Sequence, residues 1–157
     1  MRPTAEHVRE SWLHRLEPEL PGARVLDLFA GSGALGLEAL SRGARSADFV
    51  ETRPSSLHSL RANVAALRAR ERVRIFRRDA LEFAGSLATA SYEVAFADPP
   101  YLSRMLDRLI EIWLETRFAT ILTVEHALEH ELPSGGTRHT YADTAVTTYH
   151  APAREAP

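Results

Sequence analysis

The stretch A-R-V-L-D-L-F-A-G-S-G-A-L-G, from Ala23 to Gly36, decides the fold of this chain. Its first half, Arg24 to Phe29, is a short apolar run that predicts a buried strand. Its second half carries Gly31, Gly33 and Gly36 and leads into a segment with helical apolar spacing. A strand, a glycine turn and a helix in this order are typical of the first unit of a nucleotide-binding α/β fold.

The acids around this stretch indicate which nucleotide it binds. The glycines fit the dinucleotide pattern G-x-G-x-x-G, and Glu51 follows Gly31 at roughly the expected twenty residues. Asp27, at the end of the strand, would repel a pyrophosphate, whereas S-adenosylmethionine (SAM) carries an ammonium and a sulfonium and no phosphate. We therefore expect SAM as the cofactor, with an NAD-binding domain as the alternative that the glycines alone leave open.

Strands alternate with helices along the rest of the chain, which predicts an α/β fold with a mostly parallel, doubly wound sheet. The predicted helices are 4–16, 34–42, 54–70, 81–87 and 103–115, and the predicted strands are 24–29, 47–51, 73–76, 92–97 and 119–125. In the helix over 54–70, the residues expected to face inward are Leu57, Leu60, Val64 and Leu67. Residues 138–141 and 146–149 predict a closing hairpin that supplies antiparallel edge strands.

Length and composition indicate one soluble domain over residues 1–150 and a loose tail over 151–157. Hydrophobic residues make up 45% of the chain and charged residues 25%, as is typical of globular proteins. The chain has no Cys, no apolar run long enough for a membrane span and no signal-peptide pattern at its start. We therefore expect a cytoplasmic protein without a membrane partner.

The charge pattern argues mildly against strong nucleic-acid binding, because the formal net charge is −2. One basic stretch is either a solvated helix end and edge strand or a track for phosphates; it consists of Arg61, Arg68, Arg70, Arg72, Arg74, Arg77 and Arg78. We predict no metal site, since His126 and His130 do not form H-E-x-x-H and fit polar residues between a strand and a loop.

Acidic residues lie at the ends of the first four predicted strands: Asp27, Glu51, Asp79 and Asp98. Ligands of such sheets bind at the carboxyl ends of the strands, so these acids predict one ligand groove. Glu51 can accept both ribose hydroxyls, Asp79 can accept from an adenine amino group, and the Ala80 N–H suits a ring nitrogen. Taken alone, Asp79 is as well explained as a helix N-cap.

The most specific short motif is Asp98-Pro99-Pro100-Tyr101, which ends the fourth strand. Pro99 has no N–H and a fixed φ, so its carbonyl is expected to be held rigidly beside the Asp98 carboxylate. These two acceptors can hold both hydrogens of an exocyclic amino group and aim its lone pair at a methyl group. Tyr101 offers an aromatic face on which an unstacked base can lie. The motif therefore predicts methyl transfer to a conjugated nitrogen, which depends mainly on orientation.

Together, these segments resemble the RsmD family of bacterial SAM-dependent methyltransferases, which act on guanine N2 of small-subunit ribosomal RNA. The likeness spans nearly the whole chain, and the residues that carry it are Arg2–Thr4, Val8–Glu10, Leu26–Ala44, Val50–Glu51, Asp79–Ala80, Asp98–Tyr101 and Tyr141–Tyr149. Family members usually carry a basic β-hairpin before R-P-T, and here Met1 directly precedes Arg2. The resemblance therefore supports a methyltransferase more strongly than an RNA substrate.

The resemblance also implies roles for single residues. By that likeness, SAM would be bound by Thr4, Asp27, Gly31, Gly33, Glu51, Asp79 and Ala80, together with the loop residues Phe29 and Ala30. Arg9, which taken alone is a surface helix charge, would lie over the methionine end of SAM. The guanine amino group would be held by Asp98, Pro99 and Tyr101, with Pro100 completing the catalytic motif.

We therefore expect a SAM-dependent N-methyltransferase with the class I, Rossmann-like fold that acts on guanine N2 in small-subunit (16S) ribosomal RNA. The same acceptor chemistry would serve adenine N6 of DNA or a protein amide, so these substrates stay open. A non-catalytic RNA-binding or assembly module is the alternative of a different class. The expected partner is ribosomal RNA or the small ribosomal subunit, and we expect a monomer.

Overall fold

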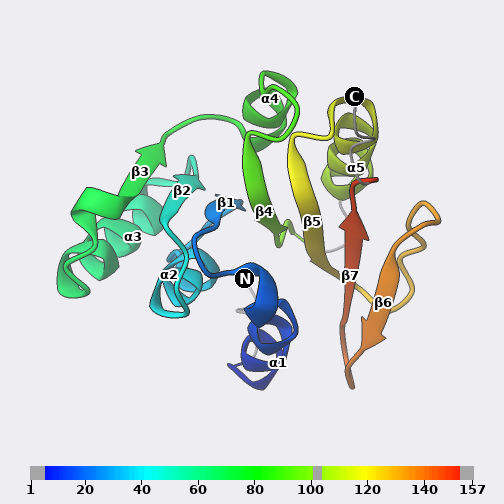
Figure 1. The fold of residues 1–157 in the computed structure, drawn as a ribbon, viewed down its shortest axis with the longest axis horizontal. Coiled ribbons are helices and arrows are strands. Elements are labelled where there is room, and N and C mark those ends of the chain that lie inside the picture. The colour runs from blue at the N-terminus through cyan, green and yellow to red at the C-terminus, as the bar shows by residue number, and fades with distance from the viewer. Residues whose placement is uncertain (1–5, 101–103, 153–157) are drawn as a thin grey trace.

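A seven-stranded sheet forms the middle of the molecule in a computed structural model, which describes residues 6–100 and 104–152 (Figure 1). The strands are β1 (Arg24–Leu28), β2 (Ser46–Val50), β3 (Val73–Phe76), β4 (Tyr92–Ala97), β5 (Ala119–His126), β6 (Thr137–Thr140) and β7 (Ala145–His150). The helices are α1 (Glu6–Leu16), α2 (Ala34–Ser41), α3 (Pro54–Ala66), α4 (Ala80–Gly85) and α5 (Met105–Thr116), with 3₁₀ turns η1 (Glu17–Glu19) and η2 (Arg70–Arg72). The predictions for Thr4, Tyr101 and most of the tail lie outside the described residues.

The strand order is β3-β2-β1-β4-β5-β7-β6, and strands β1 to β5 pair in parallel. The chain builds outward from β1 to β3 and then returns to place β4 on the other side of β1, where Leu28 pairs with Ala97. This confirms the doubly wound sheet. The order reverses between β1 and β4, and ligands bind beside such a reversal at the carboxyl ends of the strands.

The closing hairpin differs from the prediction in one respect. Both of its strands are antiparallel, as expected, but only β6 lies at the edge, because β7 pairs with β5 on one side and β6 on the other. The reason is their polarity. Strand β7 carries the buried side chains Val146 and Tyr149, whereas β6 consists of Thr137, Arg138, His139 and Thr140 and is largely exposed. The more apolar strand takes the interior position.

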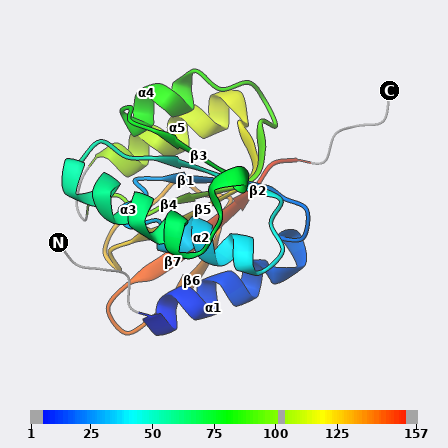
Figure 2. The ribbon, with the colours of Figure 1, turned by 90° about the vertical axis from the view of Figure 1, so that its left-hand side faces the viewer.

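Helices cover both faces of the sheet, with α1, α2 and α3 on one face and α4 and α5 on the other (Figure 2). Alternate strand residues supply the two cores, so that Val25 of β1 packs in the first core while Leu26 and Leu28 pack in the second. Burial on both faces explains why the parallel strands are apolar almost throughout. Within the two described ranges, no helix has both the length and the apolar character that crossing a bilayer requires.

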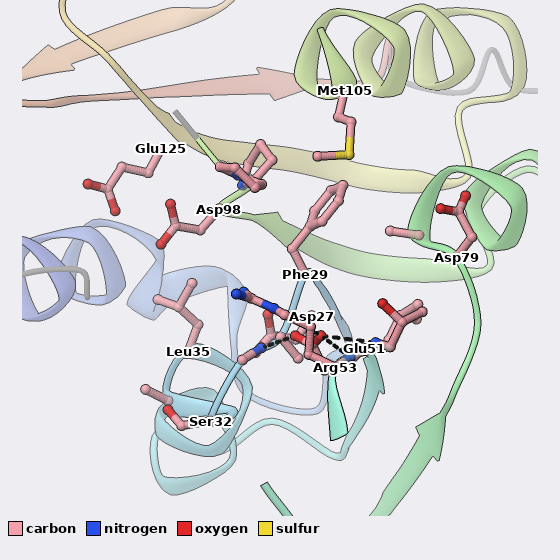
Figure 3. Close-up of a pocket in the computed structure, with 18 of the residues that line it drawn as sticks. Asp27, Phe29, Ser32, Leu35, Glu51, Arg53, Asp79, Asp98, Met105 and Glu125 are labelled. Atoms are coloured by element: carbon pink, nitrogen blue, oxygen red, sulfur yellow. Dashed lines mark hydrogen bonds and ion pairs between the residues drawn. The ribbon is translucent and has the colours of Figure 1, made fainter. Parts of the chain in front are cut away.

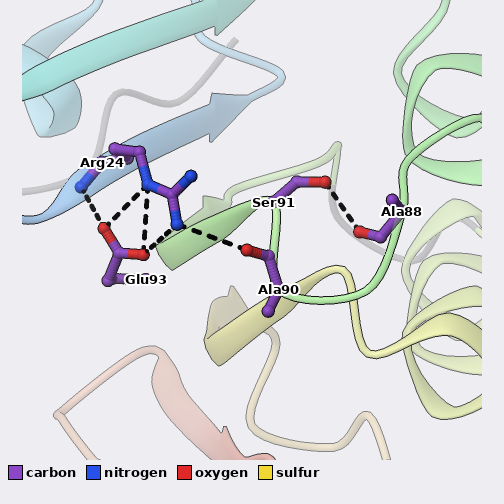
Figure 4. Close-up of polar contacts among 5 residues, drawn as sticks. All are labelled: Arg24, Ala88, Ala90, Ser91 and Glu93. Atoms are coloured by element: carbon purple, nitrogen blue, oxygen red, sulfur yellow. Dashed lines mark hydrogen bonds and ion pairs between the residues drawn. The ribbon is translucent and has the colours of Figure 1, made fainter.

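An ion pair joins β1 to β4 at the amino ends of the two strands (Figure 4). The Arg24 guanidinium donates to both carboxylate oxygens of Glu93, at 2.6 Å from Nη2 to Oε2 and 3.1 Å from Nε to Oε1. The backbone N–H of Arg24 also donates to Glu93 Oε1, at 2.7 Å. These bonds lower the pKa of Glu93, mainly through the hydrogen bond from Arg24, which keeps the carboxylate ionised. The pair fixes β1 beside β4 at the end opposite to the ligand groove.

Helix α3 is shorter than predicted, and one of its residues faces the other way. It ends at Ala66, and Leu67, expected to face inward, is 61% exposed. Arg68 takes a left-handed conformation with φ of 53°, which ends the helix before Leu67 turns back toward the core. Leu57, Leu60 and Val64 are buried as predicted.

Helix α1 is attached to the sheet mainly through Trp12. The indole Nε1 donates to Thr123 Oγ1 of β5 at 2.7 Å, and the ring lies edge-on to Phe96 of β4 with 5.6 Å between centroids. Trp12 is 1% exposed. Since Arg9 lies one turn before Trp12, this contact also places Arg9 at the carboxyl ends of the strands.

We predict that Trp12→Ala lowers the free energy of unfolding by about 3–5 kcal/mol, because it removes a large buried side chain and leaves a cavity between α1 and the sheet. Urea denaturation followed by circular dichroism measures this value. Glu10→Ala is the matched control on the exposed side of the same helix and should change stability by less than about 0.5 kcal/mol. Equal effects of the two substitutions would contradict the assigned role of Trp12.

Candidate active site

A cavity of about 770 Å³ opens at the carboxyl ends of β1, β2, β4 and β5 (Figure 3). Its size is within the range of small-molecule sites. Among the described residues, every predicted site residue except Gly33 lines it: Arg9, Asp27, Phe29, Ala30, Gly31, Glu51, Asp79, Ala80, Asp98, Pro99 and Pro100. The folded chain therefore brings the candidates from five separate segments to one place.

The glycine loop after β1 has two kinds of glycine. Gly31 has φ of 57° and faces open space, so a ligand can approach its backbone there. Gly33 has φ of 85°, and a Cβ at this position would lie 2.3 Å from Leu60 Cδ1. At Gly36 a Cβ would lie 2.5 Å from Phe49 Cε1. Close packing of α2 against its neighbours therefore requires these two glycines, and the binding of SAM by Gly33 stays a prediction.

Asp27 is buried beneath the loop, with only 2% of its surface exposed, and its carboxylate also lines the cavity. Its Oδ2 accepts a hydrogen bond from the Gly36 N–H at 3.0 Å. Burial raises the pKa of Asp27 well above its usual range. The Gly36 N–H opposes this shift, and the nearby charges of Asp98 and Glu51 add to it. A cationic ligand in the cavity would stabilise the ionised form of this group.

Glu51 holds the loop in place. Its Oε1 accepts from the Gly31 N–H at 2.7 Å, and its Oε2 accepts from the N–H groups of Thr52 and Arg53, both at 2.9 Å. A carboxylate has about four acceptor positions, so these bonds leave room for one from a ligand. If Glu51 binds both ribose hydroxyls, as predicted, its two oxygens must accept hydrogen bonds from the hydroxyls and from these backbone N–H groups at the same time.

The N-cap role suggested for Asp79 is confirmed, while its binding of an adenine amino group stays a prediction. Asp79 is the N-cap of α4, where its Oδ2 accepts from the Glu82 N–H at 3.0 Å, and it also lines the cavity. Ala80, the first residue of that helix, is buried at the same wall. Figure 3 places Asp79 at the end of the cavity opposite to Asp98. The two acids therefore bound a long site with room for an extended ligand between them.

Strand β4 ends at Ala97, and Asp98, Pro99 and Pro100 follow it into the cavity wall. Asp98 is partly exposed and Pro99 is buried. Both belong to the segment that adjoins the glycine loop across the β1–β4 pairing. Both residues line the cavity, and the binding of an amino group by their oxygens stays a prediction.

Several lining residues were missed by the sequence analysis, above all Glu125, which is 1% exposed. It follows Val124 of β5, which pairs with Ala97 just before Asp98. The same rule that identified the other acids, a carboxylate at the end of a strand, would have found it. The other missed residues include Ser32, Leu35, Arg53 and Met105, which no pattern in the sequence distinguishes, and Arg78, which was noted only as part of the basic stretch.

His126 is a structural residue, in line with the interpretation made from the sequence. Its Nδ1 donates to the Ala127 carbonyl at 3.0 Å, so its Nε2 accepts from Thr147 Oγ1 at 2.7 Å. Burial lowers its pKa, which keeps the ring neutral. His130 binds Asp107 instead, with 2.9 Å between Nε2 and Oδ1. Among the described residues, no group of three or more His, Cys, Asp or Glu is arranged to hold a metal ion.

The charges of the cavity wall suit a cation. Carboxylates from five positions line it, whereas its guanidinium groups are those of Arg9, Arg53 and Arg78. Arg53 is already paired with Glu51, at 3.9 Å from Nε to Oε2. A nucleoside with an ammonium and a sulfonium therefore fits this wall better than one with a pyrophosphate.

Comparison with known proteins shows which family the chain belongs to. A family described as "Conserved hypothetical protein 95" matches residues 1–147. Ribosomal RNA small subunit methyltransferase D of Escherichia coli strain K12 is 36% identical over 139 residues, which cover 85% of this chain and 68% of that protein. The solved structure of the protein yhhF from Escherichia coli has a TM-score of 0.83 and 31% identity, and covers 98% of this chain and 89% of that chain.

A more distant solved structure shows the fold alone. It is an RNA methyltransferase from Salinibacter ruber in complex with S-adenosyl-L-homocysteine, with a TM-score of 0.74 and 17% identity over 99% of this chain and 97% of that chain. The family match and the identity to the Escherichia coli relative over most of both chains decide the assignment. The chain therefore belongs to the RsmD family of methyltransferases, which have the class I fold and use S-adenosylmethionine as methyl donor.

Proposed function

We propose that this methyltransferase transfers the methyl group of SAM to the exocyclic N2 of a guanine in small-subunit ribosomal RNA. The observation that carries the proposal is the position of Asp98 and Pro99, whose acceptors line the same cavity as the glycine loop. The name of the Escherichia coli relative supports ribosomal RNA as the substrate. We infer that the partner is the small ribosomal subunit or its RNA and that the protein works in the cytoplasm.

The proposed cofactor site extends from Asp27 to Asp79. Asp27 and Glu51 surround the glycine loop, where their negative charges favour the cationic methionine end and the ribose hydroxyls of SAM. Asp79 and Ala80 offer an acceptor and a donor to the edge of the adenine. Arg9, on α1, lines the same cavity, which supports the proposal that it pairs with the carboxylate of the methionine.

The proposed catalytic step depends on the orientation of the amino group. Asp98 and the Pro99 carbonyl accept its two hydrogens, which directs the nitrogen lone pair into the cavity. SAM supplies an electrophilic methyl group on sulfonium, so the nitrogen forms the new bond to carbon while the carbon–sulfur pair stays on sulfur. The nitrogen then loses one proton, and the Asp98 carboxylate is the nearest proposed acceptor for it. Orientation of this kind accounts for several kcal/mol of the barrier.

Methyl transfer from radiolabelled SAM tests the proposal directly. The substrates are protein-free 16S ribosomal RNA, assembled small subunits and duplex DNA, all from cells that lack this enzyme. We expect label on ribosomal RNA or on the small subunit, and N2-methylguanosine in the nucleoside digest. Label on DNA or on protein alone, or a methylated base other than guanine, would overturn the proposal.

We predict that Asp98→Ala lowers kcat by about 10²-fold or more and leaves the dissociation constant of SAM nearly unchanged, because it removes an oriented acceptor for the amino group. Single-turnover kinetics and calorimetry measure the two quantities. Asp98→Asn, which keeps one acceptor oxygen, should lose less activity than the alanine variant. Wild-type turnover in Asp98→Ala would refute the catalytic role.

We predict that SAM binds more tightly as pH rises above the range in which an ordinary aspartate ionises, because a bound cation favours ionised Asp27 and the pKa of this group is raised. Asp27→Asn should bind SAM about tenfold more weakly at neutral pH and lose this part of the pH dependence. Calorimetry at several pH values tests both statements. The control is Glu71→Gln, an exposed acid outside the cavity wall, and an identical pH profile in Asp27→Asn would exclude Asp27 as the source.

A further inference from the structure

Glu125 and Asp98 occupy equivalent positions on neighbouring strands. Each lies one residue beyond the pair Ala97 and Val124, which are matched in the parallel ladder of β4 and β5. Phe96 and Thr123, two residues earlier on each strand, both contact Trp12 of α1. Because side chains alternate along a strand, Asp98 and Glu125 project from this same face.

The two carboxylates also share one end of the cavity. Both residues line it, and Figure 3 draws their carboxylates at the same end, away from Asp79. Neighbouring parallel strands are about 4.8 Å apart, which is a separation that lets two side chains bind adjacent atoms of one planar group. Glu125 therefore adds a second carboxylate to the place where the amino group is proposed to bind.

The hairpin of β6 and β7 holds Glu125 in position. Thr144, in the turn before β7, is fully buried, and its Oγ1 lies 2.9 Å from Glu125 Oε2 and 3.0 Å from the His126 carbonyl oxygen. A hydroxyl donates only one hydrogen, so it supports one acceptor at a time. The contact with Thr144 therefore fixes the buried Glu125 carboxylate at the cavity wall.

The chemistry of the bases indicates which ligand suits two adjacent carboxylates. Guanine has a ring N1–H directly beside its amino group, so it presents two neighbouring donors. Adenine and cytosine have a lone pair at the equivalent ring nitrogen, which a carboxylate would repel. A protein amide has no ring N–H beside its NH₂ group. A site built to accept a hydrogen strongly rejects an analogue that lacks it, because buried acceptors are then left unpaired.

We propose that Glu125 is a specificity residue whose carboxylate accepts the N1–H of the target guanine, beside the amino group that Asp98 holds. This inference rests on the proposed function and extends it, because it assigns the choice of guanine over adenine and cytosine to one residue. Thr144 is the corresponding positioning residue, since it contacts Glu125 and not the base.

The test uses small subunits rebuilt with ribosomal RNA that carries either guanine or 2-aminopurine at the nucleotide methylated by the wild-type enzyme. 2-Aminopurine keeps the amino group but has a lone pair at N1. The wild type should prefer guanine by about 10²-fold in kcat/KM. Glu125→Gln should lose activity on guanine and gain relative activity on 2-aminopurine, because its amide N–H can donate to N1. Its preference should therefore fall below about tenfold.

Two controls separate recognition from structure. Glu129→Gln changes an exposed acid three residues beyond β5 and outside the cavity wall, and should keep the wild-type preference. Each variant is also checked for its circular dichroism spectrum and its affinity for S-adenosylhomocysteine. A Glu125→Gln variant that loses activity equally on both substrates has a structural defect only, and this result would overturn the assignment.

The outcomes for the two proposals are distinguishable. If the wild type methylates guanine N2 and Glu125→Gln keeps the full preference for guanine, the assignment of Glu125 fails and the proposed function stands. If the wild type transfers no methyl group to ribosomal RNA in either form, both proposals fail. A collapsed preference in Glu125→Gln, with the wild-type preference retained in Glu129→Gln, supports the assignment.

Discussion

The pairing of β1 with β4 is the constraint on which the site depends. It brings the glycine loop beside the segment that begins at Asp98, although these segments are far apart in the chain. The ion pair of Arg24 with Glu93 secures the same two strands at their other end. Without this pairing, the groups proposed to surround the methyl donor and those proposed to hold the amino group would not face one cavity.

The cavity concentrates negative charge, and this has a cost in the protein without ligand. Asp27 is almost fully buried, and its burial disfavours the ionised form and raises its pKa. Backbone N–H groups offset part of the cost at Asp27 and Glu51, and Thr144 does so at Glu125. A cationic donor would further stabilise the ionised form of Asp27. The same carboxylates of the cavity wall therefore supply both the binding energy for a ligand and the electrostatic preorganisation of the site.

The sequence predicted the fold well because its signals are local. Alternating strands and helices, glycine turns and prolines each report on a few neighbouring residues, and β3 and β4 have the predicted ends. The prediction that Leu67 faces inward was wrong, because a single left-handed residue, Arg68, ends the helix early. The packing role of Gly33 escaped prediction because it depends on a long-range contact, in which Leu60 fills the neighbouring space. The strand-end rule could have identified Glu125 as a lining residue, but the contact from Thr144, which a hairpin later in the chain supplies, has no local signal.

The interior position of β7 has a consequence for biosynthesis. The strand that completes the sheet emerges last among the described strands, and until it docks, β5 presents an unpaired edge and Glu125 lacks its threonine partner. Open strand edges recruit other chains, so a nascent or prematurely terminated polypeptide would be both inactive and prone to aggregate. The docking of β7, late in folding, would therefore give the protein both its activity and its protection against aggregation.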